Sequence, residues 1–291
     1  MGKYYCLIAG LPNIALEDTK LAYSVAEFGS ELSGILTSRD KKLIDWFYLK
    51  FDNRNLLAFL KNPESQMDER GTISQQEFAD LYRAMKNEEK YSSSKRIPQF
   101  YKDFLSQYIA EEANDNKGFA KKTISWDDRL SALYYSQAMK CRNSFVADWF
   151  ELNLNINNVL TAITCRKHQL DKAEYIVGDN EVAESIRTSN ARDFGLGDSV
   201  EYLPELQRIA EEQDLLLREK KIDVLKWKWL DDHTFFKTFD IESVFAYLLK
   251  LEMIERWVTL DKVTGEQTFR QLVGSMKKGS INALEEFKKN N

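Results

Sequence analysis

Apolar residues recur at helical spacing along most of this chain. In residues 40–51 apolar residues occur four positions apart, at Leu43, Phe47 and Phe51. Residues at this spacing share one face of a helix, so the segment would have a single buried side. Thr37, three residues before Asp40, favours the start of a helix, and Asn62 followed by Pro63 favours its end. The pattern therefore predicts one long helix between Thr37 and Asn62.

The same pattern returns later in the chain. Residues 45–60 align without a gap with residues 148–163, and six of the sixteen positions are identical. Average composition would give about one identity by chance. Both copies begin with Asp-Trp-Phe, and the second has apolar residues around more of its circumference, which predicts deeper burial. We expect the two helices to superpose, with their aromatic side chains buried at equivalent places, as in duplicated helical lobes.

Two polar junctions divide the chain into three nearly equal parts. The first is a serine run over residues 91–98 that ends in proline, and the second is a turn with two glycines over residues 194–199. We therefore expect three helical lobes, formed by residues 1–95, 96–198 and 199–291.

Further helices are predicted between these junctions. Ser125 begins an apolar pattern as a helix N-terminus, residues 204–230 read as one long helix, and residues 241–258 form another. A shorter helix is expected after Thr264. The only strand-like stretch, residues 4–9, is explained equally well by a buried helical turn. The fold class that follows is all-α.

Composition agrees with a helical globular protein. Four Pro and twelve Gly are few for 291 residues, and Leu, Glu, Lys and Ala are abundant. The net charge of −5 argues against a general nucleic-acid-binding protein, which would carry a basic surplus. No run reaches the roughly eighteen apolar residues of a membrane span, and the start lacks a signal-peptide pattern. Three cysteines without paired spacing fit a reducing cytoplasm.

Two stretches invite a cofactor or catalytic interpretation. Residues 66–78 imitate a calcium-binding loop, but Arg70 stands at an inner ligand position, and Ser74 with Glu77 is better explained as a capping box. His233 follows two aspartates without a nearby nucleophile, and caps or solvated turns are the commoner role of such residues. No nucleotide-binding or zinc-protease motif occurs. We expect no metal, no cofactor and no catalytic residue.

A pattern of polar and apolar residues recurs in the lobes. An acid, Asn-Leu three positions on, and then apolar and basic residues occur in the first third at Asp52, Asn55, Leu56, Leu60 and Lys61. The second third has Asn155, Asn158, Val159 and Ile163, with Asn155 replacing the acid. Residues 247–256, which include Glu255, carry two acids and no Asn, and the chain starts with KYYCLIAGLP. In these features the chain resembles the family of V/A-type ATPase rotor proteins named C in bacteria and archaea and d in eukaryotes, closest to a short bacterial branch.

This resemblance implies three helical lobes around a funnel and a non-catalytic rotor part. Such a protein lies on the cytoplasmic face of the membrane proteolipid ring and accepts the foot of the central stalk, which the D and F proteins form, in its funnel. It transmits torque for ion transport and binds neither nucleotide nor nucleic acid. The implied location is cytoplasmic, peripheral to the inner membrane through partner proteins.

The recurring polar residues are the candidate sites. Asp52, Asn55, Asn155, Asn158 and Glu255 are expected at related places near the lobe junctions. Because unsatisfied buried polar groups are costly, these side chains either bond to neighbouring helix ends and hold the lobes in shape, or line the funnel and contact the stalk.

Two other classes of function remain open. The chain could be a cytoplasmic helical-repeat scaffold with other partners, since the same lobes and cores would serve. It could also be a helical enzyme in which Asp45 and Asp148 act as paired carboxylates across a pseudo-twofold axis.

Overall fold

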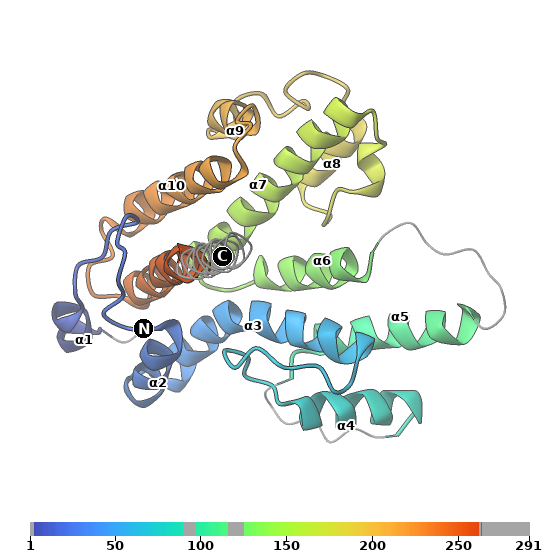
Figure 1. Cartoon of the computed structure of the whole chain (residues 1–291), viewed down its shortest axis with the longest axis horizontal. Helices are drawn as coiled ribbons and strands as arrows, with labels where there is room; N and C mark the ends of the chain where they lie inside the picture. Colours follow the sequence, from blue (N-terminus) through green and yellow to red (C-terminus); the bar gives the residue numbers. More distant parts are fainter. Residues whose placement is uncertain (1–2, 90–96, 116–124, 262, 264–291) are drawn as a thin grey trace, which may run out of the picture.

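The computed structural model describes residues 3–89, 97–115, 125–261 and 263, and within them every long element is an α-helix, without a strand (Figure 1). The all-α prediction is therefore confirmed. The elements are α1 (Tyr5–Gly10), α2 (Val25–Ile35), α3 (Ser38–Lys61), α4 (Gln75–Lys86), α5 (Gln99–Asp115), α6 (Trp126–Ala138), α7 (Ser144–His168), η1 (Lys172–Glu174), α8 (Glu181–Thr188), η2 (Gly197–Ser199), α9 (Leu203–Ala210) and α10 (Leu215–Thr234). A further helix covers residues 241–261 and is called the C-terminal helix below.

The predicted helix starts are confirmed by their caps. The Thr37 hydroxyl accepts a hydrogen bond from the Asp40 amide at 3.2 Å, and α3 ends before Asn62. Ser125 caps α6 in the same way, and Ser74 forms a complete capping box with Glu77 at the start of α4. These caps satisfy amides that have no partner inside the first helical turn.

Residues 204–230 are not one long helix, so that prediction is wrong. The chain forms α9 and α10 with a break between them, because the Asp214 carboxylate accepts hydrogen bonds from the Leu216 and Leu217 amides at 2.8 and 3.0 Å. An Asp side chain that captures following amides competes with helix continuation and starts a new helix instead. Residues 4–9 form mostly the helical turn α1, and the helix expected after Thr264 falls outside the described residues.

The two copies of the repeat form parts of α3 and α7, in which Phe47, Trp149 and Phe150 are buried but Trp46 is only half-buried, so the expected equal burial of the two tryptophans is wrong. Helices α3 and α7 both carry buried aromatic side chains, and α7 buries more of its residues, as expected. Trp46 contacts Phe150 of the second copy, with ring centroids 6.4 Å apart, and Trp149 contacts Trp229 of α10 at 5.7 Å. Each repeated tryptophan therefore packs on an aromatic ring from the next third of the chain.

Helices α5 and α6 connect the two copies. Helix α5 packs on α4 and α6, and α6 lies between α3 and α7, as Figure 1 shows. The Tyr134 hydroxyl of α6 donates to the Trp46 carbonyl at 2.7 Å, and its ring contacts Phe150. One hydrophobic core runs through the first, second and last thirds of the described chain.

The starts of α3, α7 and the C-terminal helix are tied together. The Tyr4 hydroxyl donates to the Asp40 carboxylate at 2.6 Å, while the Tyr4 amide donates to the Phe239 carbonyl at 2.8 Å. Asn143, which caps α7, donates from its amide to Glu242 at 3.0 Å. From this shared end, α3 and α7 diverge across the molecule (Figure 1).

Candidate functional site

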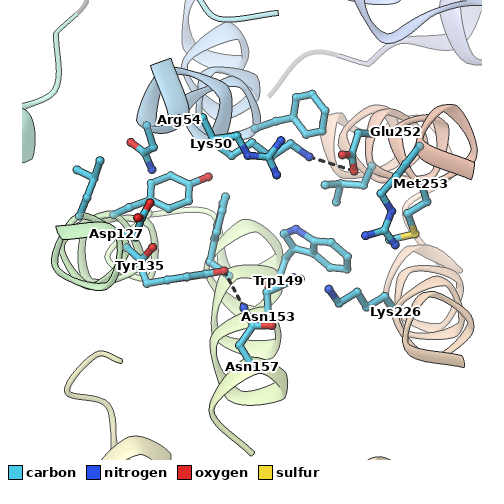
Figure 2. Close-up of a pocket in the computed structure, with 18 of the residues that line it drawn as sticks. Lys50, Arg54, Asp127, Tyr135, Trp149, Asn153, Asn157, Lys226, Glu252 and Met253 are labelled. Carbon is cyan, nitrogen blue, oxygen red and sulfur yellow. Dashed lines mark hydrogen bonds and ion pairs between the residues drawn. The ribbon is translucent and has the colours of Figure 1, made fainter. Parts of the chain in front are cut away.

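A cavity of about 400 Å³ lies between α3, α6, α7, α10 and the C-terminal helix. We call it the central cavity. Its lining residues come from all three thirds of the sequence. Figure 2 shows Lys50 and Arg54 approaching it from one side, Asn153 and Asn157 from a second, and Glu252 from a third.

Three helices contribute to the cavity with the same spacing. Offsets of 103 and 202 residues from α3 give the corresponding positions in α7 and in the C-terminal helix. The three sets, each of one residue per helix, are Phe47, Phe150 and Leu249; Lys50, Asn153 and Glu252; and Arg54, Asn157 and Arg256. Positions separated by three and seven residues share one face of a helix, so the three helices present equivalent faces to the cavity.

Exposure rises along these three faces in parallel. The first set is buried, the second is half-buried and the third is exposed, in every one of the three helices. The cavity therefore opens away from the tied helix starts and towards Arg54, Asn157 and Arg256.

Charged groups line the half-buried level of the cavity. The Lys50 ammonium lies 3.0 Å from the Glu252 carboxylate and also over the Phe47 ring at 4.3 Å from its centroid. Burial lowers the pKa of Lys50, and Glu252 opposes that effect. Although burial acts to raise it, the pKa of Glu252 is lowered by Lys50 and by nearby arginines. This ion pair links α3 directly to the C-terminal helix.

A second charged cluster joins α10 to the C-terminal helix. The buried Asp223 carboxylate accepts hydrogen bonds from the Arg256 guanidinium and, at 2.8 Å, from the Trp257 indole. Lys226, one turn further along α10, also lines the cavity, and burial lowers its pKa while Asp223 acts to raise it.

Asn55 of α3 and Asn158 of α7 make the same kind of hydrogen bonds. The Asn55 amide donates to the Asp68 carbonyl at 3.0 Å and accepts from the Asp68 amide at 2.7 Å. Asn158 makes the same pair of bonds to Val177, at 2.7 and 3.0 Å. Each asparagine satisfies one residue's backbone in the loop before the next helix, and both are buried. Neither lines the central cavity.

Asp52 and Asn155 tie the same helices to the starts of α4 and α8. The Asp52 carboxylate accepts from the Thr72 amide, the Thr72 hydroxyl and the Ile73 amide at 2.7, 2.8 and 3.0 Å. Burial raises its pKa, and these hydrogen bonds act in the opposite direction. Asn155 accepts at 2.9 Å from Asn180, the residue that caps α8.

Glu255 lies in a different environment from these four residues. Its carboxylate accepts from the Val25 amide at 3.0 Å, at the start of α2, and lies 3.5 Å from Arg70. By the offset that matches the cavity positions it corresponds to Asn53, not to Asp52. Glu255 thus joins the C-terminal helix to the start of α2 and to the loop before α4.

Asp45 and Asp148 are not brought together. Asp45 lines a groove between α2 and α3, whereas Asp148 lines a separate pocket with Trp229 and His233. The His233 ring stacks on Trp229 with centroids 3.8 Å apart, and its Nδ1 atom lies 2.9 Å from the Trp229 carbonyl. The two carboxylates therefore do not face a shared pocket, as a paired-carboxylate mechanism would require.

In the loop over residues 66–78, the Asp68 carboxylate, a possible calcium ligand, is bonded to another residue of the same loop. The Asp68 carboxylate pairs with Arg70 at 2.7 Å, which also lowers the pKa of Asp68. Among the described residues, no group of three His, Cys, Asp or Glu side chains is arranged to hold a metal ion. No helix of the described ranges combines the length and apolar content that crossing a membrane requires.

Sequence reasoning missed the cavity residues Lys50, Arg54, Lys226, Glu252 and Arg256. A signal existed for four of them, because extending the repeat to a third copy at an offset of 202 aligns their spacing. Lys226 carries no such signal, since it lies on α10 outside the repeated helices.

Of three comparisons with known proteins, only the one with protein families finds a match. No curated protein matches this chain. No solved structure matches it either. A family model does match over residues 1–280, so the chain belongs to the family described as "Protein of unknown function (DUF2764)".

Proposed function

We propose that this chain is a non-catalytic rotor component of a V/A-type ATPase. It couples the central stalk, formed by the D and F proteins, to the membrane proteolipid ring for ion transport. In this role the wide end of the central cavity forms a funnel that accepts the stalk, and the tied helix starts form its closed end.

The parallel rise in exposure along three equivalent helix faces carries this proposal. A funnel needs walls of the same length that separate from a common end. The buried set with Phe47 lies towards that end, and the exposed set with Arg54 lies towards the opening. The sequence resemblance predicts this arrangement of three lobes.

Rigidity is a second argument. A part that transmits torque must deform little under load, and many bonds here join segments distant in sequence. Asn55, Asn158 and Asp52 fix loops to helices, and the Lys50–Glu252 pair joins the first and last thirds. Buried, fully bonded polar networks of this kind make a fold rigid.

Co-purification tests the proposal most simply. An affinity-tagged copy of the chain is recovered from gently solubilised membranes of its own source. The expected result is recovery of the D and F stalk proteins and of the proteolipid ring in fixed ratio. Recovery of the chain without ATPase components, or of an intact ATPase without the chain, would contradict it.

The scaffold alternative makes a different prediction in the same experiment. A generic helical scaffold would be recovered with other proteins, and its gene would stand apart from those of the ATPase. An operon shared with ATPase genes would favour the rotor.

A further inference from the structure

The central cavity carries more positive charge than its own acids neutralise. Each of the three carboxylates that line it already has a basic partner in the described structure; the pairs are Asp127–Lys61, Asp223–Arg256 and Glu252–Lys50. Two lining cations, Lys226 and Arg54, are left over.

Lys226 and Arg54 have no partner of their own among the described residues. No hydrogen bond or ion pair joins either side chain to another described residue, although Asp223 lies close enough to Lys226 to act on its charge. Lys226 is half-buried in the cavity wall, while Arg54 lies at the opening. Burial of an ammonium group without a partner is unfavourable, so a negative charge in the cavity would stabilise it.

Neutral donors lie on the remaining walls. Tyr135 of α6 and Asn157 of α7 line the cavity, and the Asn157 amide lies 3.5 Å from the Tyr135 hydroxyl. Figure 2 shows Lys226, Arg54, Tyr135 and Asn157 around the same space. Positive charge on two sides and amide and hydroxyl donors on the others suit an anion with several oxygens.

We propose that the central cavity binds a small anion of two or more negative charges, held by Lys226 and Arg54. A volume of about 400 Å³ is in the range of small-molecule sites. Carboxylate and phosphate oxygens both match the planar arginine fork and the ammonium group, so either chemistry fits. The test of this site needs only the isolated chain, so its failure can be told apart from failure of the rotor proposal.

Binding is tested by calorimetric titration with inorganic pyrophosphate and with citrate, at constant ionic strength. The variants are Lys226→Met, which keeps most of the apolar stem, and Arg54→Gln at the exposed opening. Lys228→Met is the matched control, because Lys228 lies on α10, is exposed and does not line the cavity.

The expected result is one bound equivalent of at least one probe to the native chain. Both cavity variants weaken that affinity about tenfold or more, the effect of one charge-assisted hydrogen bond. Lys228→Met leaves the affinity within about twofold of the native value. Without a probe, Lys226→Met melts at or above the native temperature, since a half-buried cation without a hydrogen bond or ion pair has been removed.

Three outcomes would overturn the assignment. The first is that neither probe binds beyond a sodium chloride control. The second is equal weakening by Lys228→Met, which would mark a diffuse surface effect. The third is unchanged affinity in Arg54→Gln, whose exposed position leaves folding intact. A preference for pyrophosphate over citrate, or the reverse, identifies the phosphate or the carboxylate source.

Discussion

At the scale of single residues, Asn55 and Asn158 hydrogen-bond to loop backbone and do not line the central cavity. Asn55 and Asn158 each bond to the backbone amide and the backbone carbonyl of one loop residue, Asp68 and Val177 respectively. The sequence could show that these residues recur, because identical amides at a constant offset are visible in it. It could not show their partners, since the loops that they hold differ in length and composition.

Replacing Asn55 or Asn158 by Leu should destabilise the fold. Each change leaves a backbone amide and carbonyl without partners, at a cost of roughly 2–4 kcal/mol per variant. Denaturant unfolding measures the loss. The control is Asn157→Leu, an exposed position, which should stay within about 0.5 kcal/mol of the native protein. Unchanged stability in the first two variants together with lost stalk binding would instead make these residues a contact surface.

The pH dependence of the free energy of unfolding should reveal the lowered pKa of Lys226. Its pKa is lowered in the folded state by burial, so between that pKa and 10.5 the unfolded chain binds more protons than the folded chain. Stability from this group therefore rises with pH across that window. The free energy of unfolding of the native chain, compared with that of Lys226→Met, should shift in favour of the native chain from pH 7 to pH 10. A constant difference between the two proteins would contradict the lowered pKa.

At the scale of elements, the local sequence pattern predicts where most helices form. It does not predict which helices pack against one another. The starts of α3, α4 and α6 follow from Thr37, Ser74 and Ser125, whose caps act within three residues. The break between α9 and α10 was missed because the apolar period runs across it, while a single Asp214 carboxylate decides the boundary.

The third copy of the repeat illustrates the same limit. At an offset of 202, the places of Asp52 and Asn55 hold Ile254 and Trp257. The polar signature that marks the first two copies is therefore absent from the C-terminal helix. The C-terminal helix shares only the spacing of the cavity-facing positions with the first two copies, and that spacing alone does not single out the offset of 202 before the helices are placed in space.

The unit of α3, loop and α4 should depend on the glycine at position 71. A Cβ atom there would lie 2.4 Å from the Asn55 Nδ2 atom and 2.9 Å from an Asp52 oxygen, and hydrogen bonds hold both side chains in place. Gly71→Ala should cost about 1–3 kcal/mol of stability. Gly34→Ala in α2 is the matched control, because a Cβ there meets nothing within 4 Å, and it should be neutral or stabilising by up to about 1 kcal/mol. Equal effects in the two variants would refute the close approach.

At the scale of the whole molecule, three helices tied at one end surround a cavity that opens at the other. The ties are Tyr4 to Asp40 and Asn143 to Glu242, and the last third closes onto the first through Glu252 and Glu255. The sequence predicts the all-α class and the duplication. The closure rests on two contacts between residues more than 200 positions apart, the Lys50–Glu252 ion pair and the hydrogen bond from the Val25 amide to Glu255, which no local pattern records.

Photo-crosslinking from the opening of the central cavity tests the rotor account most directly. A photo-reactive amino acid replaces Asn157, at the opening, or Arg83, an exposed residue of α4 that does not line the cavity, in chains assembled in native membranes. The account predicts a covalent adduct with the D or F stalk protein from position 157 and none from position 83. No ATPase adduct from position 157, or equal stalk adducts from both positions, would contradict a stalk-accepting funnel.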